Sequence, residues 1–123
     1  MKSLSVLGAI VLALLVGFAR EATAQGRFIV NQLSGRCLDV VGAPGTQNGA
    51  RIVLYDCEFS GQSANLAQTD QQWQVLPSGL IRNILSGRCI DVSGGPGRNN
   101  GTPIVLFDCE VGQRNSDQYW RRQ

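Results

Sequence analysis

The most constraining feature of this sequence is a segment that occurs twice. Residues 27–58 and residues 79–110 are identical at roughly 20 of 32 aligned positions, and both contain the pentapeptide LSGRC. Each copy then continues to a Gln-x-Trp triplet, in DQQW and in DQYW. Repetition at such a period indicates a fold built from similar structural units. We therefore divide the chain into unit one, at about 27–76, and unit two, at about 79–122.

Within each unit the pattern is typical of short β-strands. Runs rich in β-branched and aromatic residues are separated by the turn sequences GAPGTQNG and GGPGRNNG, whose Pro-Gly and Asn-Gly pairs favour tight turns. No stretch after residue 24 has the period of an amphipathic helix. The sequence therefore predicts an all-β chain with four strands in each unit. The expected strands are 28–31, 37–41, 52–55, 73–76, 80–83, 89–92, 104–107 and 119–121.

The four cysteines recur at the same place in each unit. Cys37 and Cys57 enclose one strand–turn–strand segment, and Cys89 and Cys109 enclose the other. Pairing within each unit is the simplest of the three connectivities that four cysteines allow. The sequence has no histidine, which favours disulfides over a zinc site. A disulfide that closes a loop of this size stabilises a chain by about 3 kcal/mol.

Residues 1–24 are typical of a secretory signal peptide. Lys2 is followed by an uncharged run over 4–18 and then by the sequence ATA, which fits cleavage after Ala24, with Ala19 as the lesser option. The alternative, a membrane anchor, needs about 20 apolar residues. We expect a mature chain of 25–123 that is secreted, either extracellular or periplasmic, without stable membrane insertion.

The charge and the residue types argue against several functions. After residue 24 the chain has nine arginines, eight acids and no lysine, and this charge of about +1 is too weak to attract nucleic acid or an anionic membrane. Without histidine, and with no serine beside an activating base, we expect no enzyme. The acids are scattered along the sequence, so we expect no metal site and no cofactor.

The order of the motifs resembles one known family. Cys-x-Asp-Val, then Leu-aromatic-x-Cys, then Gln-x-Trp, all occurring twice, is the pattern of the ricin-B-type lectins, and it covers essentially the whole of 25–123. The resemblance implies a β-trefoil, which has three four-strand repeats around a pseudo-threefold axis and up to one shallow sugar site per repeat. It also implies a secreted protein whose partner is a glycan or polysaccharide.

The chain departs from that family in having two units rather than three. An incomplete trefoil exposes strand edges and one side of its core, which must be covered. We expect the chain to associate as a homo-oligomer, since three chains carry six units, enough for two trefoils. The alternatives are imperfect closure of a single chain and a truncated relative of a longer lectin.

Sugar binding needs an aromatic plate for the ring face and a polar group for the hydroxyls. Tyr55 and Phe107 alternate with core-type residues, so they point away from the core. The resemblance makes these two rings the stacking platforms and makes Asp39 and Asp91 the acceptors for hydroxyl groups. It also implies that Gln71 and Gln118 orient the two aspartates, and that Trp73 and Trp120 lie in the core.

Two positions differ from the galactose-binding pattern of the family. Asp70 and Asp117 replace an asparagine, and an ionised carboxylate cannot donate a hydrogen bond. Val53 and Val105 replace a glutamine. These changes argue against galactose more than against sugar in general. We expect Asp70 and Asp117 to be solvent-facing turn residues, and we keep both as candidate binding residues with a direct sugar role as the alternative.

Two other interpretations remain open. The recurring aspartates and glutamines serve only structure if no sugar binds. A secreted interaction or inhibitor module of trefoil type would instead use the longer loop at 59–69, which makes the spacing from the second cysteine to Gln-x-Trp five residues longer in unit one than in unit two.

Overall fold

The computed structural model describes residues 26–123, and the expected signal peptide lies outside the described residues. These residues form seven strands and no helix, which confirms the all-β prediction. The strands are β1 (Arg27–Phe28), β2 (Cys37–Val40), β3 (Ile52–Tyr55), β4 (Gln72–Val75), β5 (Ile81–Asn83), β6 (Cys89–Val92) and β7 (Ile104–Phe107). The described part therefore contains no helix long and apolar enough to cross a membrane.

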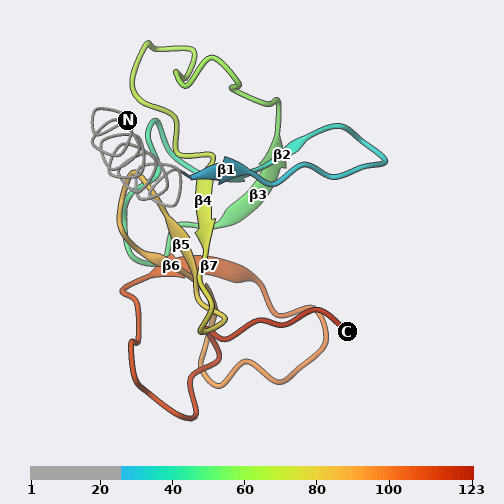
Figure 1. Ribbon diagram of the computed structural model, residues 1–123, viewed down its shortest axis with the longest axis vertical. Coiled ribbons are helices and arrows are strands. Elements are labelled where there is room, and N and C mark those ends of the chain that lie inside the picture. Colours follow the sequence, from blue (N-terminus) through green and yellow to red (C-terminus); the bar gives the residue numbers. More distant parts are fainter. Residues whose placement is uncertain (1–25) are drawn as a thin grey trace, which may run out of the picture.

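The strands form one five-stranded sheet and one hairpin. The sheet has the order β1-β4-β5-β6-β7, and β2 pairs with β3 (Figure 1). Hairpins β2–β3 and β6–β7 have the same register, with Cys37 opposite Tyr55 in one and Cys89 opposite Phe107 in the other. The repeated sequence has thus produced a repeated local structure.

The prediction of an eighth strand at 119–121 is wrong, since the described residues form no strand there. Its counterpart β4 is paired along both edges, with β1 on one side and β5 on the other. The segment around Trp120 keeps only the first kind of contact, a 2.9 Å bond from its amide to the carbonyl of Gly79. Within residues 26–123 no strand lies along its other edge.

Both disulfides pair cysteines within a unit, as the simplest connectivity predicted. Cys37–Cys57 and Cys89–Cys109 have the same Cα–Cα distance of 5.0 Å. Each joins the start of one hairpin strand to the segment just after the other strand, so it anchors the acidic residues that flank the cysteines.

The core is formed by side chains from β2, β3, β4, β6 and β7. Its buried cluster draws on both units and consists of Val40, Ile52, Trp73, Ile90 and Leu106. The indole nitrogen of Trp73 donates to the Leu38 carbonyl at 3.1 Å, so this large ring is buried without an unsatisfied N–H. The alternation predicted from the sequence is confirmed for Ile52, Ile104 and Leu106, which belong to this cluster or pack against it. It is wrong for Leu54, which is 47% exposed.

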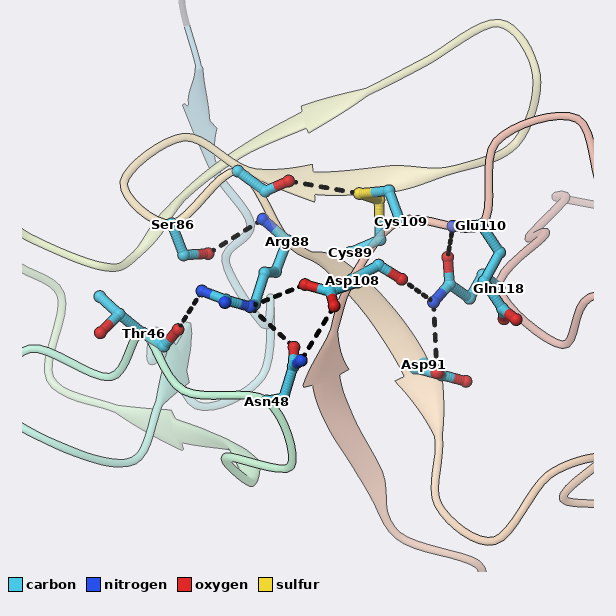
Figure 2. Close-up of polar contacts among 11 residues, drawn as sticks. Thr46, Asn48, Ser86, Arg88, Cys89, Asp91, Asp108, Cys109, Glu110 and Gln118 are labelled. Carbon is cyan, nitrogen blue, oxygen red and sulfur yellow. Dashed lines mark hydrogen bonds and ion pairs between the residues drawn. A yellow bond between two sulfur atoms is a disulfide. The ribbon is translucent and has the colours of Figure 1, made fainter.

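The contact between the units is centred on Arg88 of unit two (Figure 2). Its guanidinium donates to the Thr46 carbonyl and to Asn48 Oδ1, both at 2.7 Å, and contacts Asp108 Oδ1 at 3.1 Å. Asn48 Nδ2 also donates to Asp108 Oδ2. The turn that contains Thr46 and Asn48 is therefore held against unit two by hydrogen bonds to a charged group, which are stronger than neutral ones.

Candidate functional site

Each hairpin has a hollow on the face opposite the core. In unit one the hollow has a volume of about 360 Å³ and is bordered by Asp39, Tyr55, Glu58 and Asp70. The register places Asp39 opposite Val53 and two pairs away from the Cys37–Tyr55 pair, so the carboxyl group and the ring share one face of the hairpin. The Tyr55 side of the hollow is open, since this residue is 56% exposed.

The hollow of unit two has the same plan and a volume of about 460 Å³. Asp91, Phe107, Glu110 and Asp117 occupy the positions equivalent to those in unit one. Phe107 is 43% exposed, whereas Asp91 is almost completely buried. The structure therefore brings together every predicted carboxyl group and aromatic ring, once in each unit.

A carboxyl pair lies at the base of the unit-one hollow. Burial, and then the hydrogen bond and charge of the neighbouring Asp70, raise the pKa of Asp39 to about 8. Asp70 is itself buried and accepts a 2.7 Å hydrogen bond from the Gly45 amide. The prediction that Asp70 is a solvent-facing turn residue is therefore wrong. At neutral pH the Asp39–Asp70 pair holds a proton that is engaged in the hydrogen bond between the two carboxyl groups, so the remaining carboxyl oxygens act as acceptors.

The equivalent pair in unit two titrates lower. The hydrogen bond and charge of Asp91, together with burial, raise the pKa of Asp117 to about 6. Asp117 Oδ2 is buried and has no hydrogen-bond donor when the carboxyl group is ionised. A proton shared with Asp91 supplies one. The two hollows therefore differ, since the pair in unit one keeps its proton to a higher pH than the pair in unit two.

The glutamines of the two Gln-x-Trp triplets are completely buried behind the hollows. Gln118 Nε2 contacts Asp91 Oδ2 at 3.2 Å and the Asp108 carbonyl at 2.9 Å, and its Oε1 accepts from the Glu110 amide (Figure 2). The predicted contact between this glutamine and its aspartate is present in unit two.

In unit one the corresponding glutamine bonds to the backbone. Gln71 Nε2 donates to the Asp56 carbonyl at 2.8 Å, and its Oε1 accepts from the Glu58 amide at 2.8 Å. Gln71 thus satisfies buried backbone groups, which is the structural role given above as the alternative. These bonds hold the segment after β3 that carries Glu58.

A third acid in each hollow was missed from the sequence. Glu58 accepts from Thr69 Oγ1 at 2.7 Å, and Glu110 accepts from Ser116 Oγ at 2.9 Å. The available signal was the recurrence of glutamate directly after the second cysteine of each unit.

The expectation that the acids are scattered is wrong in space. The carboxyl oxygens of each trio lie within 4.8 Å of one another. Each trio could supply three oxygen ligands, fewer than the six to eight that Ca²⁺ takes.

The longer loop of unit one belongs to the hollow. Ser63, Ala64, Asn65 and Gln68 line its rim, opposite the cis-proline turn at Pro44. Figure 1 shows this loop as the extended segment that leads into β4. The five additional residues thus enlarge one wall of the unit-one hollow.

The two tryptophans of the Gln-x-Trp triplets differ in burial. Trp73 is 1% exposed, as predicted for a core residue. The same prediction is wrong for Trp120, which is 37% exposed although its indole nitrogen contacts the Ile90 carbonyl at 3.3 Å, just as Trp73 contacts the equivalent Leu38. Unit two covers Trp73, and no further unit covers Trp120 within the described residues.

Comparison with known proteins agrees with this architecture. Residues 23–123 match the family described as ricin-type β-trefoil lectin domain. The fold resembles the crystal structure of a designed 3-fold symmetric protein, ThreeFoil, with a TM-score of 0.55 and 24% identity over 76% of this chain and 61% of that chain. A solution structure of the mdaA-1 domain has a TM-score of 0.48 and 28% identity over 67% of this chain and 46% of that one. The chain thus spans less than two thirds of either structure. With the motifs occurring twice and the family match covering nearly every described residue, the chain belongs to the ricin-type β-trefoil lectin family.

Proposed function

We propose that this protein is a secreted lectin that binds glycans weakly through the two hollows, without catalysing a reaction. The observation that supports this proposal is the same in both units. An exposed aromatic ring borders a hollow whose base carries a carboxyl pair. A sugar offers an apolar C–H face to such a ring and hydroxyl groups to the carboxyl oxygens, which is the combination of apolar wall and few polar groups typical of small-ligand sites.

The charge of the hollows restricts the class of sugar. Unit one has Asp39, Glu58 and Asp70 around its hollow, and no arginine borders it. Unit two has three equivalent acids. Acidic sugars such as uronic or sialic acids would be repelled, so we propose neutral or amino sugars as the ligands. The proton on the Asp39–Asp70 pair reduces the negative charge of the unit-one hollow, which favours neutral sugars there.

Binding at one hollow should be weak. One stacked ring with three or four exposed hydrogen bonds corresponds to a Kd of about 0.1–1 mM, or about −4 to −5.5 kcal/mol. Retention on a polysaccharide then requires both hollows, because linked weak sites gain from effective concentration. The two disulfides fit an extracellular location, where they persist.

The proposal is tested by retention of the oxidised protein on immobilised glycans that include galactosides, xylan and chitosan, with elution by free sugar. Tyr55→Ala and Phe107→Ala each remove one ring, and we expect each to weaken retention by roughly 10-fold or more, since a stacked ring contributes about 1–2 kcal/mol. Leu33→Ala is the matched control, because Leu33 is 98% exposed and borders neither hollow.

The outcomes separate the lectin from the alternatives. Competable retention that is lost only with the ring variants supports the proposal. A folded protein that no glycan retains, or one that the double variant Tyr55→Ala with Phe107→Ala leaves unchanged, would overturn it. Binding to a protein that Tyr55→Ala does not affect would favour the interaction module instead.

A further inference from the structure

The contact between the two units provides a template for a second contact that the described chain leaves unmade. The amide of Gly49 donates to the Leu106 carbonyl at 2.7 Å, and the amide of Leu106 donates to the Ala50 carbonyl at 2.8 Å. The residue equivalent to Leu106 in unit one is Leu54. No turn from a preceding unit lies against Leu54 in residues 26–123.

The free face of unit one consists of Val30, Asn31, Arg36, Leu54 and Asp56. Leu54 is 47% exposed, whereas its counterpart Leu106 is completely buried. Asn31 is exposed, whereas its counterpart Asn83 is completely buried and donates to the Asp70 carbonyl at 2.7 Å.

The ion pair on this face lacks the neighbouring turn that contacts its counterpart in unit two. Arg36 pairs with Asp56 at 2.6 Å, as Arg88 pairs with Asp108. The Arg88 pair is closed over by Thr46 and Asn48 of the neighbouring unit. The Arg36 and Asp56 side chains are instead 53% and 80% exposed.

The free face of unit two consists of Asn100, Gly101, Thr102, Asp117 and Trp120. Trp120 is 37% exposed where Trp73 is buried. The segment after Asp117 has an unpaired edge where β4 is paired with β5. An unpaired backbone edge beside an exposed tryptophan is a surface that proteins cover.

In the threefold arrangement of a trefoil, the two free faces are the surfaces that a third unit would contact. The similar threefold-symmetric protein is consistent with this, since the chain spans 61% of its length. We propose that a unit of a second copy of this chain fills the gap, so that three chains assemble into two complete trefoils. In two of the chains, units one and two pack against each other as described here. The third chain donates one unit to each of these two.

The donating chain must open between its units. A trefoil has places for three units, and the recipient chain already fills two of them. If the two units of the donating chain stayed packed together, its second unit would clash with the recipient. The connection from β4 to β5 is the short turn at 76–80, and this exchange of identical elements between copies is a known route to oligomers.

The chemistry of a donated unit one matches the unit-one face of the recipient. Its Thr46 carbonyl and Asn48 side chain would close over Arg36 as they do over Arg88. Its Gly49 amide and Ala50 carbonyl would bond to Leu54. Backbone groups make the bonds to the leucine, so a donated unit two offers Gly101 and Thr102 in the same way.

The test is to measure the mass of the oxidised protein by sedimentation equilibrium over a range of concentrations. We expect this mass to be three times the mass of a single chain, as measured by mass spectrometry on the same sample. Leu54→Arg places a charge at the centre of the contact and is expected to reduce the mass to that of one chain. Val111→Arg is the matched control, since Val111 is a 77% exposed residue outside both free faces, and it should keep the three-chain mass.

A second measurement holds even if Leu54→Arg fails to fold. Dilution of the unmodified protein should shift tryptophan emission to longer wavelength as Trp120 becomes exposed, and Trp120→Phe should abolish that shift while Trp73 still emits. A folded protein of one-chain mass at every concentration would overturn the proposal. So would a two-chain mass, or an assembly that Leu54→Arg leaves intact in folded form.

Discussion

The carboxyl pair in the unit-one hollow should make the protein less stable as pH rises from 4 to 8. In the folded state the pKa of Asp39 is about 8, against 3.8 for a free aspartate. Between these values the folded protein holds a proton that the unfolded chain has lost, so the free energy of unfolding falls with increasing pH. The stabilisation is complete below pH 4 and is lost as the pH approaches 8. Asp39→Asn removes the titrating group and keeps its shape.

The size of this effect follows from one bound proton. A full proton difference changes the free energy of unfolding by about 1.4 kcal/mol per pH unit. Asp39 is half-buried and its hollow is open to water, which screens the interaction and narrows the pH range over which the proton difference persists. Asp39→Asn should therefore flatten the slope by about 1.4 kcal/mol per pH unit within that range, from pH 4 to at most pH 8, and Asp117→Asn should do so only up to about pH 6.

The assay is urea unfolding at a series of pH values and one protein concentration, with Asp56→Asn as the control. The Asp56 side chain is 80% exposed outside both hollows, so its substitution should leave the slope above pH 5 unchanged. Equal slopes for the unmodified protein and Asp39→Asn between pH 5 and 7 would refute the shared proton. A steeper loss of stability with pH in Asp39→Asn would do the same.

Three further changes have expected outcomes. Leu106→Ala should lower the free energy of unfolding by about 2–5 kcal/mol in a urea titration, because Leu106 is completely buried; a loss below 1 kcal/mol would mean that the core is not packed around it. Gly97→Ala should weaken sugar retention by the unit-two hollow and spare Tyr55-dependent retention, since Gly97 has a φ of 47° and a Cβ there would lie 2.0 Å from Val92 Cγ1; unchanged retention in a Tyr55→Ala background would contradict this. Reduction of both disulfides should cost about 3 kcal/mol for each loop and unfold the protein at room temperature, which circular dichroism before and after dithiothreitol would show.

The repeat made most of the fold predictable. Each prediction made for one unit could be compared with the equivalent residues of the other unit. Most strands, the turns and both disulfide pairings were predicted in this way. The eighth strand and the burial of Trp120 did not follow, because both depend on what lies beside unit two rather than on the local sequence. Trp73 and Trp120 sit in the same motif, and only the neighbouring unit makes one of them a core residue.

The candidate site was predictable in its members but not in its electrostatics. The positions of Asp39 and Tyr55 follow from strand register and alternation. The closeness of Asp70 to Asp39 does not, because the two residues lie 31 positions apart in the sequence, with strand β3 and long loop segments between them. From the sequence Asp70 was interpreted as the isolated loss of a donor, whereas in space it shares a proton with Asp39.

The contact between the units has a consequence for how such chains can diversify. The turn that holds the units together reads TQNGA in unit one and RNNGT in unit two, and only the asparagine and glycine are shared. Its bonds from the Thr46 carbonyl, the Gly49 amide and the Ala50 carbonyl come from the main chain, so most of its side chains are free to vary without loss of docking. Units that differ in their hollows can therefore pack against each other through the same main-chain contact. Repeats with different sugar preferences could be combined in one chain without a change in the contact between the units.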